Sequence, residues 1–144
     1  MLTKKEVVLH WFDEVWNNGN LAAIDELFAA DGIAYGLGEH GINVVGPGAF
    51  KPFVQKIRDA FPDIHITVEQ TVEEGDWIAA RFSAQMTHTG DALGILPTGR
   101  RVAVSGMTMT RIANGQIVEG YNNWDIAGMM QQLHDGPMEA TLLR

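Results

Sequence analysis

The stretch GYNNWDIAGMMQQL, residues 120–133, places a carboxylate, two side-chain amides and an indole immediately before an apolar segment. A carboxylate that is basic enough can act as a general base and remove a proton from a carbon next to a carbonyl group. Burial beside Trp124, Ile126 and Met129 would raise the pKa of the Asp125 carboxyl by disfavouring its charged form. These residue types therefore predict acid/base chemistry on a carbonyl compound, with Asp125 as the base.

Asp125 also has a structural interpretation. It stands directly before IAGMMQQL, whose spacing predicts a short helix, and aspartate is among the best residues for capping a helix N-terminus. The helix dipole stabilises a capping aspartate as the anion, which is the reverse of what a general base needs. At this level both roles, base and cap, stay open.

His88 is the second candidate for chemistry. It ends the apolar face of a predicted strand, so it could reach a pocket mouth and hydrogen-bond a substrate oxygen or the aspartate, or it could be a structural donor. The chain has no cysteine, which excludes disulfides and thiolate ligands. We expect no metal site, because the other histidines show no ligand spacing on one element: His10, His40, His65 and His134.

Composition limits the class of protein. At 144 residues we expect one domain, residues 1–144, with a core of about 3–134 and a tail of 135–144. Hydrophobic residues at 46% and charged residues at 19% indicate a packed globular chain. The formal charge of −8, without any basic run, argues against nucleic acid and anionic membranes as partners. Neither a signal-peptide pattern nor a membrane-length apolar run occurs, so we expect a cytoplasmic protein.

Helical spacing occupies the first part of the chain. Apolar residues three and four apart predict one helix from Thr3, a second over 21–28, and a third over about 50–61, with Pro52 in its first turn. The glycine-rich passage 31–48 should hold a short strand and a loop. It lacks the lysine-serine ending of a phosphate loop, so we expect no nucleotide.

The periodicity then changes to two. Alternation predicts strands within 63–76, 77–90, 100–112 and 116–124. On the last of them, alternation places Tyr121 and Asn123 on the side of Asp125, and Asn122 and Trp124 on the other side.

Helices followed by strands are typical of an α+β fold, in which the helices pack on one face of an antiparallel sheet. Three short helices cannot cover a strongly bent sheet, so a cone with an interior pocket follows, closed by a short C-terminal helix. Such a pocket favours a small apolar molecule. We expect it to be lined by Trp11, Tyr35, Phe53, Thr108, Tyr121, Asn123, Trp124 and Met129.

Several motifs carry a family resemblance: EHG at 39–41, GPGAF at 46–50, FPDIHI at 61–66, THTGDALGILPTGRRV at 87–102 and RIANGQIVEGYNNWDIAGMMQQL at 111–133. With them the chain resembles the SnoaL-like polyketide cyclases, within the cone-shaped nuclear-transport-factor-2-like fold. The resemblance implies an intramolecular aldol condensation without metal or cofactor. It also implies that Asp125 is the acid/base, that His88 matches a family histidine, and that a homodimer forms through the outer face of the sheet. The exposed residues there would be Thr67, Glu69, Ser105, Met107 and Met109.

The chain departs from the family at two pocket positions. Thr108 stands where the cyclases carry a histidine, and Ala34 where they carry an asparagine. The fold and Asp125 stay implied, but the aldol reaction loses two polar partners. A non-enzymatic protein that binds a hydrophobic ligand is the first alternative. Epoxide hydrolysis of the limonene type is the third choice of function. That reaction needs an arginine flanked by two acids, and Arg81 has Ser83 where one acid would stand.

Overall fold

A computed structural model describes residues 1–37 and 43–135 of the chain. The EHG motif and residues 136–144 of the predicted tail lie outside the described residues. The helical segments are α1 (Lys4–His10), the π-helical η1 (Trp11–Asn17), α2 (Ala22–Leu27), α3 (Gly46–Ala60) and α4 (Ile126–Asp135). The strands are β1 (Phe28–Tyr35), β2 (Val44–Val45), β3 (His65–Glu74), β4 (Trp77–Thr87), β5 (Arg101–Ala113) and β6 (Gln116–Trp124).

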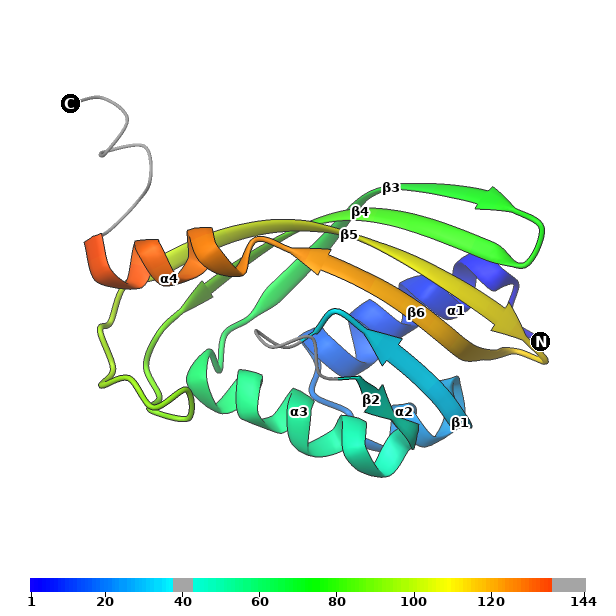
Figure 1. Ribbon diagram of the computed structural model, residues 1–144, viewed down its shortest axis with the longest axis horizontal. Coiled ribbons are helices and arrows are strands. Elements are labelled where there is room, and N and C mark those ends of the chain that lie inside the picture. The colour runs from blue at the N-terminus through cyan, green and yellow to red at the C-terminus, as the bar shows by residue number, and fades with distance from the viewer. Residues whose placement is uncertain (38–42, 136–144) are drawn as a thin grey trace.

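The six strands form one sheet in the order β2-β1-β6-β5-β4-β3. All neighbours pair antiparallel except β1 and β6, which are parallel. Figure 1 shows the long strands curving over α1, α2 and α3, which lie on one side of the sheet, with α4 at its end. The predicted α+β class with a bent sheet and a C-terminal helix is confirmed.

The first helix changes its winding halfway. Thr3 and Glu6 form a capping box at its start, and the helix continues into η1 with bonds such as Asn18 N–H to the carbonyl of Asp13. Its buried residues come in pairs four apart: 7 and 8, 11 and 12, 15 and 16. A four-residue repeat is longer than the 3.6-residue turn of an α-helix. The wider π turns therefore keep all three pairs facing the sheet.

Two predicted boundaries are wrong. The helix α3 begins at Gly46, so Pro52 lies in its interior and not in the first turn. The GPG turn joins the helix because Pro47, and not Pro52, occupies the first turn, where a proline costs no hydrogen bond. The second helix ends before Phe28, which starts the eight-residue β1. The pairing of β1 with the inner strand β6 overrides the helical spacing at Phe28.

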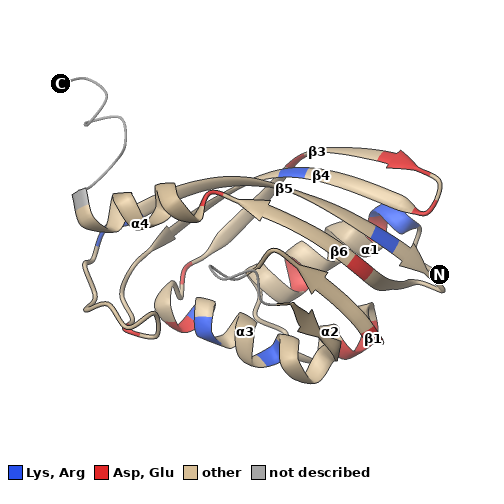
Figure 2. Cartoon of the chain, in the orientation of Figure 1, with Lys and Arg blue, Asp and Glu red and all other residues tan. Residues whose placement is uncertain are grey.

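Side chains alternate across the sheet as predicted. Every second residue of β4 from Ile78 to Met86 is buried, while the outer residues Thr67, Glu69, Ser105, Met107 and Met109 are exposed. The tight turn between β5 and β6 has positive φ at Asn114 and Gly115, as a two-residue hairpin turn requires. Figure 2 shows charged residues on the helices and at single positions along the strands, separated by long uncharged stretches on β5 and β6. Among the described residues no helix is long and apolar enough to cross a membrane.

The helix α4 protects an open sheet edge. Because β6 ends at Trp124, opposite Gly106, the beginning of β5 has no strand on that side. The buried Gln132 side chain takes the strand's place: its Oε1 accepts from Ala103 N at 2.9 Å and its Nε2 donates to the Ala103 carbonyl at 2.8 Å. This pairing satisfies edge groups that would otherwise be open to another chain, and it fixes α4 over the sheet.

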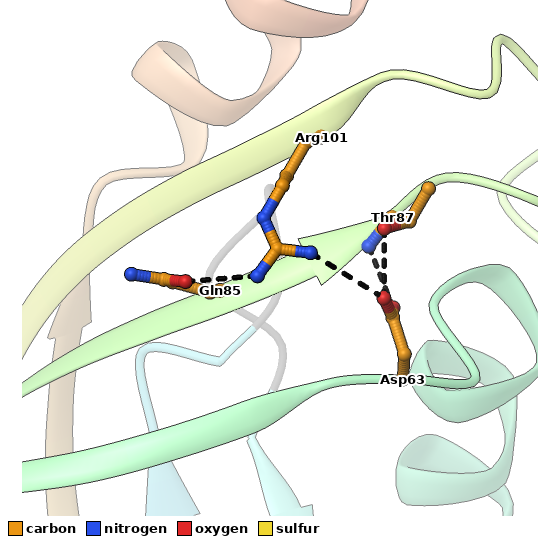
Figure 3. A network of polar contacts seen from close by, with 4 residues as sticks. All are labelled: Asp63, Gln85, Thr87 and Arg101. Atoms are coloured by element: carbon orange, nitrogen blue, oxygen red, sulfur yellow. Dashed lines mark hydrogen bonds and ion pairs between the residues drawn. The ribbon is translucent and has the colours of Figure 1, made fainter.

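A polar network joins the turn between α3 and β3 to the end of β4 and the start of β5 (Figure 3). The Asp63 carboxylate accepts from the Thr87 N–H at 2.6 Å and from the Thr87 hydroxyl at 2.7 Å. Arg101 lies 3.9 Å from that carboxylate and donates to Gln85 at 2.9 Å. Burial alone raises the pKa of Asp63, but the hydrogen bonds from Thr87 and the charge of Arg101 outweigh it, so the pKa lies below its ordinary value of 3.8.

Candidate active site

A cavity lies between the inner face of the sheet and the helices, with a volume of about 90 Å³. Its walls are carbon-rich and are dominated by aromatic side chains: Trp11, Phe12, Trp16, Phe28, Phe50, Phe53, Phe61, Phe82 and Trp124. Among the described residues that line it, none has a charged side chain. A site of this kind excludes water and binds apolar molecules, with a few polar groups to orient them.

The aromatic wall is tightly packed. The ring of Phe50 lies 4.9 Å from that of Trp11, 5.2 Å from that of Phe28 and 5.9 Å from that of Phe53. On the opposite side Phe12 lies 5.5 Å from Phe82. Rings held at such distances are in stabilising contact, so they define a fixed shape for the cavity.

The polar groups of the cavity lie on β5 and β6. We call Thr108, Thr110, Asn122 and Trp124 the polar strip; all four line the cavity. Thr108 is paired directly with Asn122, and Trp124 is two residues further along β6 on the same face. Side chains at such diagonal positions can reach one another when one of them is long. The strip therefore brings hydroxyl, amide and indole groups to one patch of an otherwise apolar wall.

Two atoms of this strip have no hydrogen-bond partner within the described part of the chain. They are the Thr108 Oγ1 and the Trp124 Nε1, and both are buried. A buried donor without a partner costs about 1–3 kcal/mol, so such groups are rare in folded proteins. A ligand with an acceptor oxygen would satisfy both.

Asn122 has a more structural position. Its Nδ2 donates to the carbonyl of Tyr35 at 2.9 Å and to that of Gly120 at 3.4 Å, which ties the end of β1 to β6. This orientation directs the other amide atom, Oδ1, away from those carbonyls. Asn122 was not predicted to line the pocket. Its position opposite Thr108 on the last hairpin could have indicated that it does.

Asp125 caps α4. Its Oδ1 accepts from the Gly128 N–H at 2.9 Å, and its backbone N–H donates to the carbonyl of Ser105 at 3.1 Å. A Cβ on Gly128 would lie 2.7 Å from the Asp125 Cγ and would overlap Oδ2, so only glycine admits this placement of the carboxylate. No hydrogen bond to Oδ2 is found from the described residues.

The expected burial of Asp125 is wrong, because the residue is exposed. The chain leaves the sheet after Trp124, and one oxygen of the carboxylate turns to the N-terminus of α4. Asp125 is not among the lining residues, but Trp124, which precedes it, and Met129 in the first turns of α4 are. The carboxylate therefore stands beside the cavity, with one oxygen in the cap and the other without a protein partner among those described.

His88 is fully buried but does not line the cavity. Its Nδ1 accepts from the backbone N–H of Thr98 at 3.2 Å, and its ring packs 5.4 Å from that of Phe61. Its backbone N–H donates to the carbonyl of Arg100 at 2.9 Å, and its carbonyl accepts from Gly99. Because Nδ1 is an acceptor, the neutral ring carries its proton on Nε2, which is buried without a partner in the described part of the protein. These contacts close the loop between β4 and β5.

Six of the eight expected lining residues reach the cavity: Trp11, Phe53, Thr108, Asn123, Trp124 and Met129. The predicted placement of Tyr121 on the pocket side is wrong. It is 45% exposed, lies opposite the exposed Met109 and stacks on Tyr35 at 4.8 Å, so both tyrosines lie outside the lining.

The cause is a change of backbone direction. Alternation extended through Asp125 predicts Tyr121 on the cavity side, but β6 ends one residue before Asp125, so Asn122 and Trp124 face the cavity. Asn123 is largely exposed, opposite the exposed Met107, although it also contributes to the lining.

The remaining candidates lie elsewhere. Arg81 is exposed and not part of the lining, and Ser83 donates to Glu69 at 2.6 Å. Within the described residues no three histidine or acidic side chains gather in a way that could hold a metal ion. Ala34 does line the cavity, at the position where the resemblance expected an asparagine.

Chemically, the arrangement combines two unpartnered donors inside an apolar cavity with a carboxylate at its side. Donors that await an oxygen stabilise negative charge as it develops on that oxygen, and they act more strongly where water is excluded. A carboxylate can take a proton from the neighbouring carbon. These are the two elements that enolisation of a carbonyl compound needs.

Comparison with known proteins identifies the family of the chain. The family model described as SnoaL-like polyketide cyclase matches residues 6–133. A nogalonic acid methyl ester cyclase of Streptomyces nogalater is 32% identical over 122 residues, which cover 83% of this chain and 90% of the relative. An aklanonic acid methyl ester cyclase of Streptomyces peucetius is 29% identical, with 83% of each chain covered.

Solved structures show the same fold. The crystal structure of IdmH from Streptomyces antibioticus superposes with a TM-score of 0.79 at 29% identity and covers 92% of this chain and 99% of its own. A SnoaL-like protein of a Jannaschia species gives a TM-score of 0.83 at 25% identity, with 93% of both chains covered. On these grounds, the chain belongs to the SnoaL-like polyketide cyclase family.

Proposed function

We propose that the protein is a cofactor-independent acid/base enzyme that acts on a small apolar carbonyl compound and closes a ring in it. The observation that carries the proposal is the pair of buried, unpartnered donors on Thr108 and Trp124, of which Trp124 is the neighbour of Asp125 in the chain. The cyclase names of the curated relatives support ring closure as the reaction type.

In this mechanism the substrate oxygen accepts hydrogen bonds from Thr108 Oγ1 and Trp124 Nε1. The Asp125 Oδ2 removes a proton from the adjacent carbon, and the C–H electron pair becomes the C=C bond of an enolate while the carbonyl π pair moves to the oxygen. The enolate carbon then attacks a second carbonyl of the same molecule, which forms the C–C bond. The proton on Asp125 returns to the resulting alkoxide, so the carboxylate is regenerated.

The carboxylate can serve both cap and base because its two oxygens are used separately. Oδ1 holds the N-terminus of α4 through Gly128, and this bond fixes the direction of Oδ2. A carboxylate held in one orientation is a more effective general base than one that rotates freely, because effective molarity depends on orientation. His88 is not part of the proposed step, because it lies behind the lining and binds Thr98.

Exchange of carbon-bound hydrogen for deuterium tests the proposal. One-ring ketones and β-keto esters are incubated in D₂O with the parent protein or with Asp125→Asn, and the loss of the α-proton signal is followed by proton NMR. Asparagine caps a helix about as well as aspartate, so the variant should stay folded. We expect the parent to accelerate exchange and the variant to give the rate of buffer alone.

Equal exchange with both proteins would remove Asp125 from the mechanism. Ligand binding without any exchange would favour the alternative function, a protein that holds a hydrophobic ligand, which the capping role of Asp125 on its own would suit.

We also propose that two copies associate through the outer face of the sheet. Met107 is 60% and Met109 49% exposed there, next to Tyr121, whose ring lies 6.2 Å from that of Trp77. Exposed apolar side chains that gather on one face are typical of a protein interface. Light scattering should give the mass of a dimer for the parent, and a double Met107→Lys, Met109→Lys variant should give the mass of a monomer. A monomeric parent would contradict the proposal.

A further inference from the structure

We infer that Gln132 is a positioning residue for the base: its side chain holds α4 in one register along β5 and, through Gly128, fixes the Asp125 carboxylate. The role assigned to Gln132 rests on the proposed function, in which Asp125 is the base. It follows from the hydrogen bonds of one buried amide, from the strand edge that the amide occupies and from the contacts that would remain without it.

The side-chain amide of Gln132 is buried and makes hydrogen bonds on two sides. Only 8% of the residue is exposed. Its Oε1 accepts from the Ala103 N–H at 2.9 Å, and its Nε2 donates to the Ala103 carbonyl at 2.8 Å. The same Nε2 donates to the Gly128 carbonyl at 3.2 Å. A primary amide has two N–H donors, so one serves the strand and the other serves the helix.

Gly128 links this amide to the base. Its carbonyl accepts from Gln132, and its N–H donates to the Asp125 Oδ1 at 2.9 Å. The three residues have the spacing i, i+3 and i+7, which places them on one face of a helix. Hydrogen bonds in series therefore run from Ala103 on the sheet to the carboxylate.

The start of α4 is attached to the same strand edge. The backbone N–H of Asp125 donates to the Ser105 carbonyl at 3.1 Å. Ser105 and Ala103 are alternate residues of β5, and alternate residues of an antiparallel strand direct their backbone groups to the same neighbour. With two attachments on one edge, both the place and the direction of α4 are set.

Apolar contacts alone do not set this register. Met129 and Leu133 are buried and belong to the core. Hydrophobic contact is non-directional, so it favours burial of this face of α4 but allows the helix to shift slightly along the sheet. A hydrogen bond requires a donor–acceptor distance of about 2.7–3.2 Å and a nearly straight angle, so Gln132 selects one of these positions.

Loss of the Gln132 side chain should displace the carboxylate. The helix can then tilt about its attachment to Ser105. Gly128 lies about 4.5 Å along the helix axis from Asp125, so a tilt of about 10° moves the Gly128 N–H by about 0.8 Å. Because Oδ1 follows this N–H and a misplacement of about 1 Å can cost on the order of 100-fold in rate, we expect deuterium exchange to fall about 10- to 100-fold.

Gln132→Met removes the amide and keeps the packing. Methionine is unbranched and flexible, so it can fill the same space, but it has no donor. The backbone carbonyl of residue 132, which accepts from Arg100 at 3.4 Å, is unchanged, so α4 should stay on the sheet. Gln131→Met is the matched control, because Gln131 is the half-buried neighbour on α4 and no hydrogen bond to its side chain is found within the described residues.

Exchange and binding are measured with cyclohexanone on the parent and both variants. Urea titration first defines conditions in which each protein is folded, and exchange at saturating ketone is given per folded molecule. Thr108 and Trp124 lie on β5 and β6 and not on α4. Gln132→Met should therefore keep the parent's Kd and lose exchange, whereas Gln131→Met should keep both. Exchange at the parent's rate in Gln132→Met would overturn the inference.

The backbone N–H signal of Gly128 gives a readout that needs no catalysis. This N–H binds the carboxylate and belongs to the peptide before the carbonyl that Gln132 binds, so it reports the position of Oδ1. In proton–nitrogen correlation spectra it should move in Gln132→Met and stay in place in Gln131→Met. An unmoved signal in Gln132→Met would show that the amide does not hold the carboxylate.

The proposed function and the role of Gln132 can fail separately. A parent protein that exchanges deuterium no faster than buffer refutes the proposed function, and the Gly128 signal then decides alone whether Gln132 holds the carboxylate. Fast exchange in the parent and equally fast exchange in Gln132→Met refute only the role of Gln132.

Discussion

The glycine in the first turn of α4 gives a sharp test of how Asp125 is held. In Gly128→Ala the new Cβ would lie 2.7 Å from the Asp125 Cγ, whereas carbon atoms prefer about 3.5–4.0 Å, so the carboxylate must move by about 1 Å. A misplacement of about 1 Å can cost on the order of 100-fold in rate. We therefore expect deuterium exchange to fall by about that factor.

Stability should hardly change in the same variant. Loss of the cap costs about 1 kcal/mol, and replacing glycine by alanine in a helix gains up to about 1 kcal/mol, so the two effects nearly cancel. For a chain of this length a net difference below about 1 kcal/mol shifts Tm by no more than about 4 °C. The variant therefore tests the position of the Asp125 carboxylate while the stability of the fold stays nearly constant.

Gly48→Ala is the matched control. Gly48 is the third residue of α3, as Gly128 is of α4, and no atom lies within 4 Å of the position its Cβ would take. It should be unchanged or slightly stabilised, with full exchange activity. Urea titration and the proton NMR exchange assay measure both properties on all three proteins. If Gly128→Ala exchanges deuterium as fast as the parent, the cap does not position the base and this reasoning is refuted.

Two further substitutions address other parts of the molecule. Asp63→Asn should lower the free energy of unfolding by about 1 kcal/mol at pH 7, a value kept small because Asp63 is exposed. Since the folded-state pKa of Asp63 is lowered, this deficit should disappear as the pH falls through that pKa, which urea titrations at several pH values would reveal; a constant deficit would contradict the Thr87 bonds as its source. His88→Leu should cost about 2–3 kcal/mol, because the Thr98 N–H loses its acceptor, yet exchange per folded molecule should be unaltered; a specific loss of exchange would give His88 a catalytic part.

Much of the fold could be predicted because local pattern and tertiary structure agree. The alternation of β4 and the helical stripes of the first helix each put apolar residues on one face, and the structure buries those faces. The strand β1 could not be predicted in full, since FAADGIAY shows neither alternation nor a continuous apolar run. It is a strand because β6 lies beside it, and that information comes from more than 80 residues further along the chain.

The candidate site, too, could be predicted only in part. Asp125, Thr108 and Trp124 could be found from residue type and from the family resemblance. The direction of each side chain could not, because it depends on where β6 ends, and an error of one residue exchanges Tyr121 for Asn122. The role of Gly128 could not be predicted either, because it depends on where the Asp125 carboxylate lies in the folded structure.

The most direct test of the central claim measures binding and proton removal in the same samples. Cyclohexanone is titrated into the parent and into Asp125→Asn to obtain Kd, and α-proton exchange is then followed at saturation. Because the ketone oxygen is bound by Thr108 and Trp124, the account predicts equal Kd in both proteins and exchange only in the parent. Exchange that continues in Asp125→Asn at the parent's rate would contradict it.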